Sequence, residues 1–118
     1  MIRFARSLKV CAMKMYSIVY SDMAKEQLNQ LVLYIVQDSG DIDVAIRYYD
    51  RIEEAIEKLS GYPYLGSNPS DSILRLQGYR MLVIERHLAF YKVNDTEKRV
   101  CISGIFDSRM EYRFLLQT

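Results

Sequence analysis

The sequence predicts an α+β fold with the order β-α-α-β-β-β-β, an antiparallel sheet, an N-terminal helical hairpin on one of its faces and a short C-terminal helix. Two runs of apolar residues at helical spacing, separated by Ser39-Gly40-Asp41, predict the hairpin. Short apolar runs rich in β-branched and aromatic residues, separated by polar turns, predict the strands. The length of 118 residues and the hydrophobic content of 50% fit one domain with one core.

The first half of the chain predicts one strand and two helices. Residues 16–21 alternate and are β-rich, as in a strand. Asp22 is placed to cap the first helix, which Ser39-Gly40-Asp41 stops. The second helix is expected to start near Asp43 and to end at residues 60–63, with a charged outer face. The short connection between the helices predicts antiparallel packing.

The second half predicts four more strands, at residues 73–77, 79–86, 88–93 and 98–106. Their short connections imply an antiparallel sheet, with the hairpin on one face and the opposite face left open for a partner. Asp107 is placed to cap a terminal helix. Its apolar residues that could pack back on the domain are Met110, Phe114 and Leu115.

Charge is distributed unevenly within the net charge of +1. Residues 1–14 carry Arg3, Arg6, Lys9 and Lys14 without an acid, residues 15–74 are acidic overall, and residues 75–118 are basic overall. We expect residues 1–14 to be a basic N-terminal extension, either disordered or read from an upstream start, and residues 15–118 to form the single domain. An arm ordered along the sheet edge is the alternative.

The cysteine and histidine content excludes several classes of site. Cys101 lies within an apolar strand and Cys11 in the basic extension, so a disulfide is not expected, and a reducing cytoplasm fits. Two cysteines and one histidine are too few for a recognisable metal site. No apolar run reaches the roughly 20 residues that span a bilayer, so no membrane association is predicted.

Arginines recur near the ends of the predicted strands: Arg75, Arg80, Arg86 and Arg109. Arginine is permanently charged and donates two hydrogen bonds to one phosphate, so several on one sheet would suit an anionic partner. Ordinary surface arginines are the alternative. His87 stands at a junction of two strands, where it is either a surface residue or a group able to transfer protons near neutral pH.

Several segments follow one another in an order typical of one known superfamily. They are Tyr16-Ser-Ile-Val-Tyr-Ser21, Asp43-Val-Ala-Ile-Arg-Tyr-Tyr49, Leu74-Arg-Leu-Gln-Gly-Tyr-Arg80, Leu88-Ala-Phe-Tyr-Lys-Val93 and Val100-Cys-Ile-Ser-Gly-Ile-Phe-Asp-Ser-Arg109. From Met15 to its C-terminus the chain resembles the RelE/ParE superfamily, the toxins of bacterial type II toxin–antitoxin systems. No single segment is specific; the order and spacing carry the resemblance.

The resemblance implies one of two activities. RelE-like members cleave mRNA in the ribosome; there Arg80 and Arg109 would stabilise the phosphate, Arg75 would bind RNA, and His87, Tyr91 or Glu111 would transfer protons. ParE-like members bind DNA gyrase and trap it on cleaved DNA, which requires a surface. Both would be neutralised by a cognate antitoxin, through which alone they would contact operator DNA, and neither implies a cofactor or a metal.

Three positions depart from the family pattern. Relatives often carry arginine, histidine and a basic residue where this chain has Gly104, Asp107 and Met110. These losses, with the low net charge, weaken the nuclease hypothesis. The sequence thus predicts a growth-inhibiting, plasmid-stabilising toxin that is a ParE-like gyrase inhibitor. The alternatives are a RelE-like endoribonuclease and a binding module with decayed activity.

The predicted site residues follow from these hypotheses. The catalytic candidates are Arg80, Arg109 and His87, and the binding candidates are Arg75, Arg86, Tyr91 and Glu111.

Overall fold

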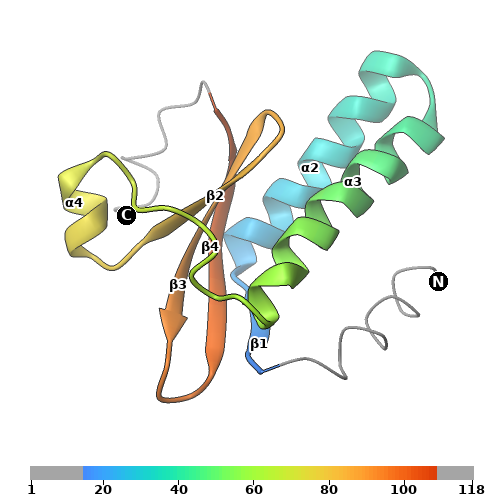
Figure 1. The fold of residues 1–118 in the computed structure, drawn as a ribbon. Helices are drawn as coiled ribbons and strands as arrows, with labels where there is room; N and C mark the ends of the chain where they lie inside the picture. Colours follow the sequence, from blue (N-terminus) through green and yellow to red (C-terminus); the bar gives the residue numbers. More distant parts are fainter. Residues whose placement is uncertain (1–14, 109–118) are drawn as a thin grey trace.

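The computed structural model describes residues 15–108 and has the predicted α+β class, with a helical hairpin and a sheet (Figure 1). Its elements are β1 (Ser17–Tyr20), α2 (Asp22–Ser39), α3 (Ile42–Glu57), the 3₁₀ helix η1 (Lys58–Ser60), α4 (Ser72–Leu76), β2 (Arg80–Ile84), β3 (His87–Asn94) and β4 (Arg99–Asp107). The predicted terminal helix and the extension of residues 1–14 lie outside the described residues. None of the helices in the described part is both long enough and apolar enough to cross a membrane.

The sheet is mixed, with the strand order β1-β4-β3-β2. β2, β3 and β4 pair antiparallel as predicted, whereas β1 runs parallel to β4. The expectation of a wholly antiparallel sheet was therefore wrong for β1. The hairpin helices α2 and α3, the short helices η1 and α4, and the strands β2 and β3 separate β1 from β4 in the chain. A connection of this length allows parallel pairing.

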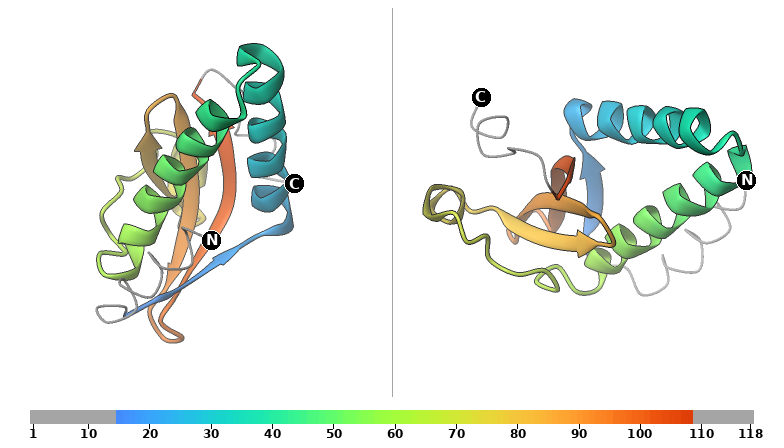
Figure 2. Two further views of the ribbon diagram at one scale, coloured as in Figure 1. Left: turned by 90° about the vertical axis from the view of Figure 1, so that its right-hand side faces the viewer. Right: turned by 90° about the horizontal axis from the view of Figure 1, so that it is seen from above.

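Local hydrogen bonds define the hairpin. Ser21, rather than the predicted Asp22, caps α2: its Oγ accepts from the Ala24 N–H at 3.0 Å and donates to the Ser103 carbonyl of β4 at 2.8 Å. Gly40 ends α2 in the left-handed region, with φ of 72°, which glycine adopts at low cost. The hairpin tip projects beyond the sheet (Figure 2).

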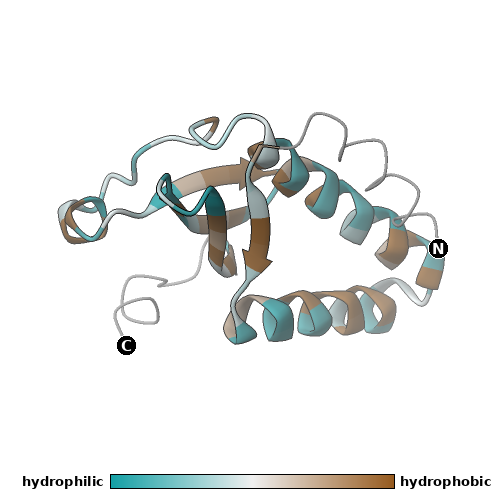
Figure 3. Ribbon diagram, turned by 90° about the horizontal axis from the view of Figure 1, so that it is seen from below, coloured by the Kyte–Doolittle hydropathy of each residue, from teal (hydrophilic) through white to brown (hydrophobic). Residues whose placement is uncertain are grey.

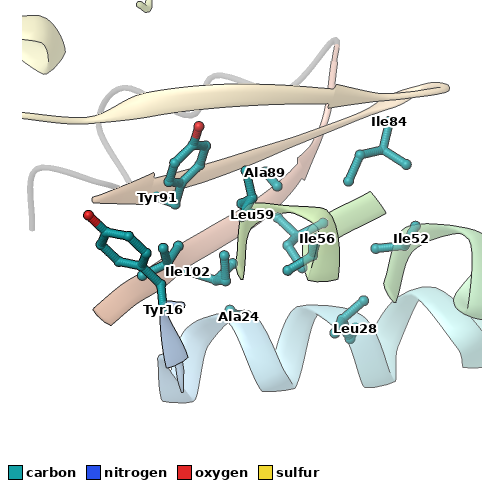
Figure 4. Packing of buried hydrophobic residues seen from close by; sticks show 12 residues of the cluster. Tyr16, Ala24, Leu28, Ile52, Ile56, Leu59, Ile84, Ala89, Tyr91 and Ile102 are labelled. Carbon is teal, nitrogen blue, oxygen red and sulfur yellow. The ribbon is translucent and has the colours of Figure 1, made fainter. Parts of the chain in front are cut away.

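The main core lies between the hairpin and one face of the sheet (Figure 4). Ile52 and Ile56 of α3 are fully buried, as are Ala89 and Ile102 on the sheet. Burying one such isoleucine stabilises the fold by about 1.5–3 kcal/mol. Polar and apolar residues alternate around both helices, as expected of helices with one buried side (Figure 3).

The predicted strand at residues 73–77 is instead the short helix α4. The Asp71 carboxylate accepts from the Ile73 and Leu74 N–H groups at 2.9 and 3.1 Å, which starts a helical turn. Gly78, with φ of 89°, then turns the chain into β2. A short apolar run does not distinguish a strand from a helix, and the side-chain cap decides here.

The sheet face opposite the hairpin is partly covered. A second cluster of buried residues on this side joins α4 to β3 and β4: Leu74, Leu88, Phe90 and Phe106. The expectation that this face is left open was therefore wrong in part, because α4 inserts the fully buried Leu74 there.

Candidate partner-binding surface

Arg80, a predicted catalytic residue, anchors a loop. From the start of β2 its guanidinium donates to the carbonyls of Tyr64 at 3.1 Å and Gly66 at 2.5 Å, and to Asn68 Oδ1 at 3.2 Å. It also lies over the Tyr64 ring, 5.1 Å from the centroid. A guanidinium has five N–H groups, so these contacts use much of its capacity inside the fold.

Tyr91, a predicted binding residue, pairs with Arg80 in the β2–β3 register and supports the same loop. Its side chain has no exposed surface, and its hydroxyl accepts from the Gly66 N–H at 3.0 Å. A Cβ at Gly66 would lie 2.7 Å from this hydroxyl and 2.5 Å from the Met81 carbonyl, so only glycine fits. Tyr91 is enclosed within the part of the chain that the structure describes, and its assignment as a binding residue stays a prediction.

A carboxylate between two tyrosines extends this loop anchor. The Tyr16 and Tyr64 hydroxyls donate to the two oxygens of Asp95, at 2.6 and 2.5 Å. The hydrogen bond to Asp95 raises the pKa of Tyr16 to about 12 and also raises the pKa of Tyr64. The same two bonds lower the pKa of Asp95. This network fixes β1 and the loop to the β3–β4 turn.

Arg75 lies on α4, where its Nη1 donates to the carbonyls of Pro69 and Ser70, both at 2.8 Å. These bonds close the loop on its far side. Arg75 and Arg80 thus hold adjoining segments of one loop, residues 64–70.

His87 begins β3, half-buried against α3. Its Nδ1 is hydrogen-bonded to the Tyr48 hydroxyl at 2.8 Å, and the two rings meet edge to face. Burial lowers the pKa of His87, opposed by the charges of Asp107 and Glu85. The imidazole is therefore mainly neutral at pH 7, and a neutral imidazole can accept a proton.

The predicted catalytic residues do not come together within the described residues. Arg80 pairs with Tyr91 and Ile84 with His87, so Arg80 and His87 stand at opposite ends of β2, about 13 Å apart at 3.3 Å per residue. Arg86 is in the turn beside His87, and its carbonyl accepts from the Ser108 N–H at 2.9 Å. Arg109 and Glu111 follow outside the described residues.

Gly104, where relatives often carry arginine, has a packing role. A Cβ there would lie 2.6 Å from the ring of Phe106, which folds over the glycine. Phe106 also packs edge to face on Phe90 in the second cluster. A side chain at position 104 would therefore have to displace a core aromatic ring.

Two groups of exposed apolar side chains are available to partners. The loop surface consists of Tyr62, Tyr64, Leu65, Ile73 and Leu76, and the hairpin tip of Leu33, Tyr34, Ile42 and Ile46. Leu76 is 87% exposed and stands next to Arg75. Aromatic and aliphatic anchors beside arginines are the usual composition of a protein–protein contact. No three potential metal ligands gather within residues 15–108.

Several residues that shape this surface were missed by the sequence reasoning. Asp95 and Tyr16 are 79 positions apart, and Tyr48 and His87 are 39 apart, so no local pattern joins them. Gly66 gave the one available signal, a glycine among polar residues, but its close contact with Tyr91 depends on the tertiary fold.

Comparison with known proteins places the chain in a family. Residues 18–112 match the family model described as the ParE toxin of the type II toxin–antitoxin system parDE. The chromosomal ParDE system from P. aeruginosa shares the fold at a TM-score of 0.66 and 21% identity, over 79% of this chain and 96% of that one.

A second solved structure has the same fold at greater distance. The toxin–antitoxin complex RelBE2 from Mycobacterium tuberculosis aligns at a TM-score of 0.54 and 17% identity, covering 78% of this chain and 96% of that one. A search among curated proteins finds no match. The family match spans most of the chain and confirms the resemblance to the RelE/ParE superfamily: this chain belongs to the ParE toxin family of type II toxin–antitoxin systems.

Proposed function

We propose that this ParE-family toxin inhibits bacterial growth as an inhibitor of DNA gyrase and is neutralised by a cognate antitoxin. The observation that carries the proposal is the separation of the cationic and titratable groups within residues 15–108. The Arg80 guanidinium donates hydrogen bonds to carbonyls of the loop of residues 64–70, and His87 lies beside the other end of β2. Phosphodiester cleavage needs an acid, a base and a cation around one phosphate. The arrangement of the cationic and titratable groups within residues 15–108 therefore favours binding of a partner protein over catalysis.

The antitoxin is proposed to lay an extended or helical segment over the sheet and the hairpin. The match to ParE toxins and the likeness to toxin–antitoxin complexes support such a partner. Affinity would come mainly from apolar anchors on the loop surface and the hairpin tip, with acidic groups facing Arg75. Operator DNA would be reached only through the antitoxin, and the complex would act in the cytoplasm.

Induction of the toxin alone tests the target. The expected result is DNA damage with intact messages by primer extension, and accumulation of gyrase–DNA cleavage complexes with purified gyrase. Codon-spaced cuts in translated messages would reject the gyrase proposal.

One pair of variants tests where gyrase would bind. Leu76→Asp on the loop surface and Leu33→Asp on the hairpin tip each place a charge on an exposed leucine, 87% and 55% exposed, with little effect on the core. We expect Leu76→Asp to weaken gyrase inhibition about tenfold or more, the effect of losing a well-packed anchor. Leu33→Asp is the matched control; an equal loss in both variants would argue against the loop surface.

The second candidate is a RelE-like, ribosome-dependent mRNA endoribonuclease. The neutral His87, oriented by Tyr48 and next to Arg86, favours it, because this group could accept a proton near a phosphate. Message cleavage that disappears in His87→Gln would support this candidate. If the chain binds its antitoxin but causes neither DNA damage nor cleavage, it is a binding module with decayed activity.

A further inference from the structure

We propose that Tyr64 is the residue of the loop surface by which this toxin recognises gyrase, because its ring is held in place before the partner arrives. This inference rests on the proposed function and names the residue that determines the specificity of gyrase binding. The group that Tyr64 would accept from gyrase is an aliphatic side chain. A few aromatic residues carry most of the binding energy of a protein–protein contact, and a side chain that is already ordered loses less entropy on binding.

The backbone that carries Tyr64 is a β-turn. The Leu65 N–H donates to the Tyr62 carbonyl at 3.0 Å, and Pro63 occupies the second position of the turn, which its fixed φ favours. The Arg80 guanidinium of the neighbouring strand β2 donates to the Tyr64 carbonyl at 3.1 Å. The turn therefore presents two tyrosines, Tyr62 and Tyr64, from a fixed backbone.

The Tyr64 side chain is held by two contacts of its own. Its hydroxyl donates to Asp95 Oδ2 at 2.5 Å, and the Arg80 guanidinium lies over its ring, 5.1 Å from the centroid. Asp95 is held in turn by the Tyr16 hydroxyl, which donates to its other oxygen at 2.6 Å. These contacts fix the orientation of the ring, while Tyr64 remains 51% exposed.

Tyr62 is the comparison that the chain itself offers. It stands two positions earlier in the same turn and is 66% exposed. Within the part of the chain that the structure describes, its side chain makes no hydrogen bond, ring contact or cation–π contact. Tyr62 would therefore lose rotamer freedom when a partner covers it, whereas the ring of Tyr64 is already ordered in the free protein.

The exposed part of Tyr64 determines the class of partner group. Its hydroxyl is bonded and Arg80 covers one face of the ring, so the opposite face remains for gyrase. A cation on one face draws on the π-electrons that a second cation would need, so an aliphatic group suits the free face better. Leu65, which follows in the chain and is 52% exposed, continues this apolar contact. Arg75 beside the loop surface favours an acidic residue of gyrase near the aliphatic one.

The affinity of the full chain for purified gyrase, measured by surface plasmon resonance, tests the assignment. We expect Tyr64→Ala to weaken binding about tenfold or more, and Tyr62→Ala about threefold or less. Asp95→Ala frees the ring and should weaken binding about three- to tenfold, the effect of having to order one more side chain on association. Asp95→Ala combined with Tyr64→Ala should bind no more weakly than Tyr64→Ala alone, because no ring is left to position.

Tyr16→Phe is the control for stability. It removes the other hydrogen bond to Asp95 and should lower the urea midpoint, yet it leaves the Tyr64 hydroxyl bonded and should leave the gyrase affinity unchanged. Equal losses in Tyr62→Ala and Tyr64→Ala, additive losses in the double variant, or a loss confined to antitoxin binding would overturn this inference while the proposed function stands. If the wild type itself does not bind gyrase, the proposed function fails and this inference fails with it.

Discussion

At the scale of single residues, charge alone does not identify a functional group. Arg80 was predicted as a phosphate-binding residue, yet its guanidinium holds the carbonyls of Tyr64 and Gly66. Tyr91 was predicted to bind a partner, yet it is buried and accepts from the Gly66 N–H. Both residues support one loop, and loss of either would alter the surface that this loop presents.

Arg80→Ala should lower the free energy of unfolding by about 1–2 kcal/mol, because it leaves loop carbonyls without their charged donor. Tyr91→Phe should cost a similar amount by leaving the Gly66 N–H without its acceptor. Urea denaturation measures both. If the two variants lose the same stability but only Arg80→Ala relieves toxicity, Arg80 contacts the target directly. If Arg80→Ala and Tyr91→Phe both relieve toxicity, the conformation of the loop is what the target requires.

Protonation of His87 should destabilise the fold as the pH falls. Burial lowers its pKa from the usual 6.5, so the unfolded chain takes up the proton first. The stability is fully present above pH 6.5 and is lost as the pH falls through the lower pKa of the folded state. Urea midpoints at pH 7.5 and 5.0 should differ in the wild type and differ less in His87→Gln. An equal pH dependence in both would contradict this origin.

At the scale of elements, short polar contacts join parts of the chain that are far apart in sequence. Ser21 caps α2 and binds the Ser103 carbonyl of β4, and Arg51 of α3 forms an ion pair with Glu85 in the β2–β3 turn at 2.6 Å. Asp95 joins β1 and the loop through Tyr16 and Tyr64. These contacts set where the loop surface lies relative to the hairpin.

The Asp95 network should stabilise the fold only between two pH limits. The raised pKa of Tyr16, about 12, gives stability that is present below pH 10 and lost between 10 and 12. The lowered pKa of Asp95 gives stability that is present above its usual 3.8 and lost as the pH falls through its folded value. Thermal unfolding of Asp95→Asn should show a lower melting temperature at pH 7 and a weaker change above pH 10. Glu97→Gln, an exposed acid in the same turn, is the control.

At the scale of the whole molecule, the buried side of α3 holds the hairpin on the sheet while its tip stays exposed. Ile52→Ala should cost about 2–5 kcal/mol, since Ile52 is fully buried against residues of the sheet. Ile46→Ala in the same helix, at a residue 46% exposed, should cost much less. Denaturant unfolding compares the two; equal losses would mean that the hairpin tip is itself packed.

The sequence by itself determined the α+β class, the hairpin with its stop at Gly40, and the positions of β2, β3 and β4, because apolar periodicity and turn residues act locally. The order of the segments along the sequence also indicated the toxin family. The helix at residues 72–76 was missed because the local Asp71 cap was not weighed against a short apolar run. Only the tertiary structure decided that β1 lies parallel to β4 and that Arg80 and Tyr91 hold a loop, because these contacts, such as Tyr91 with Gly66, join segments that are distant in the sequence and meet only in the folded chain.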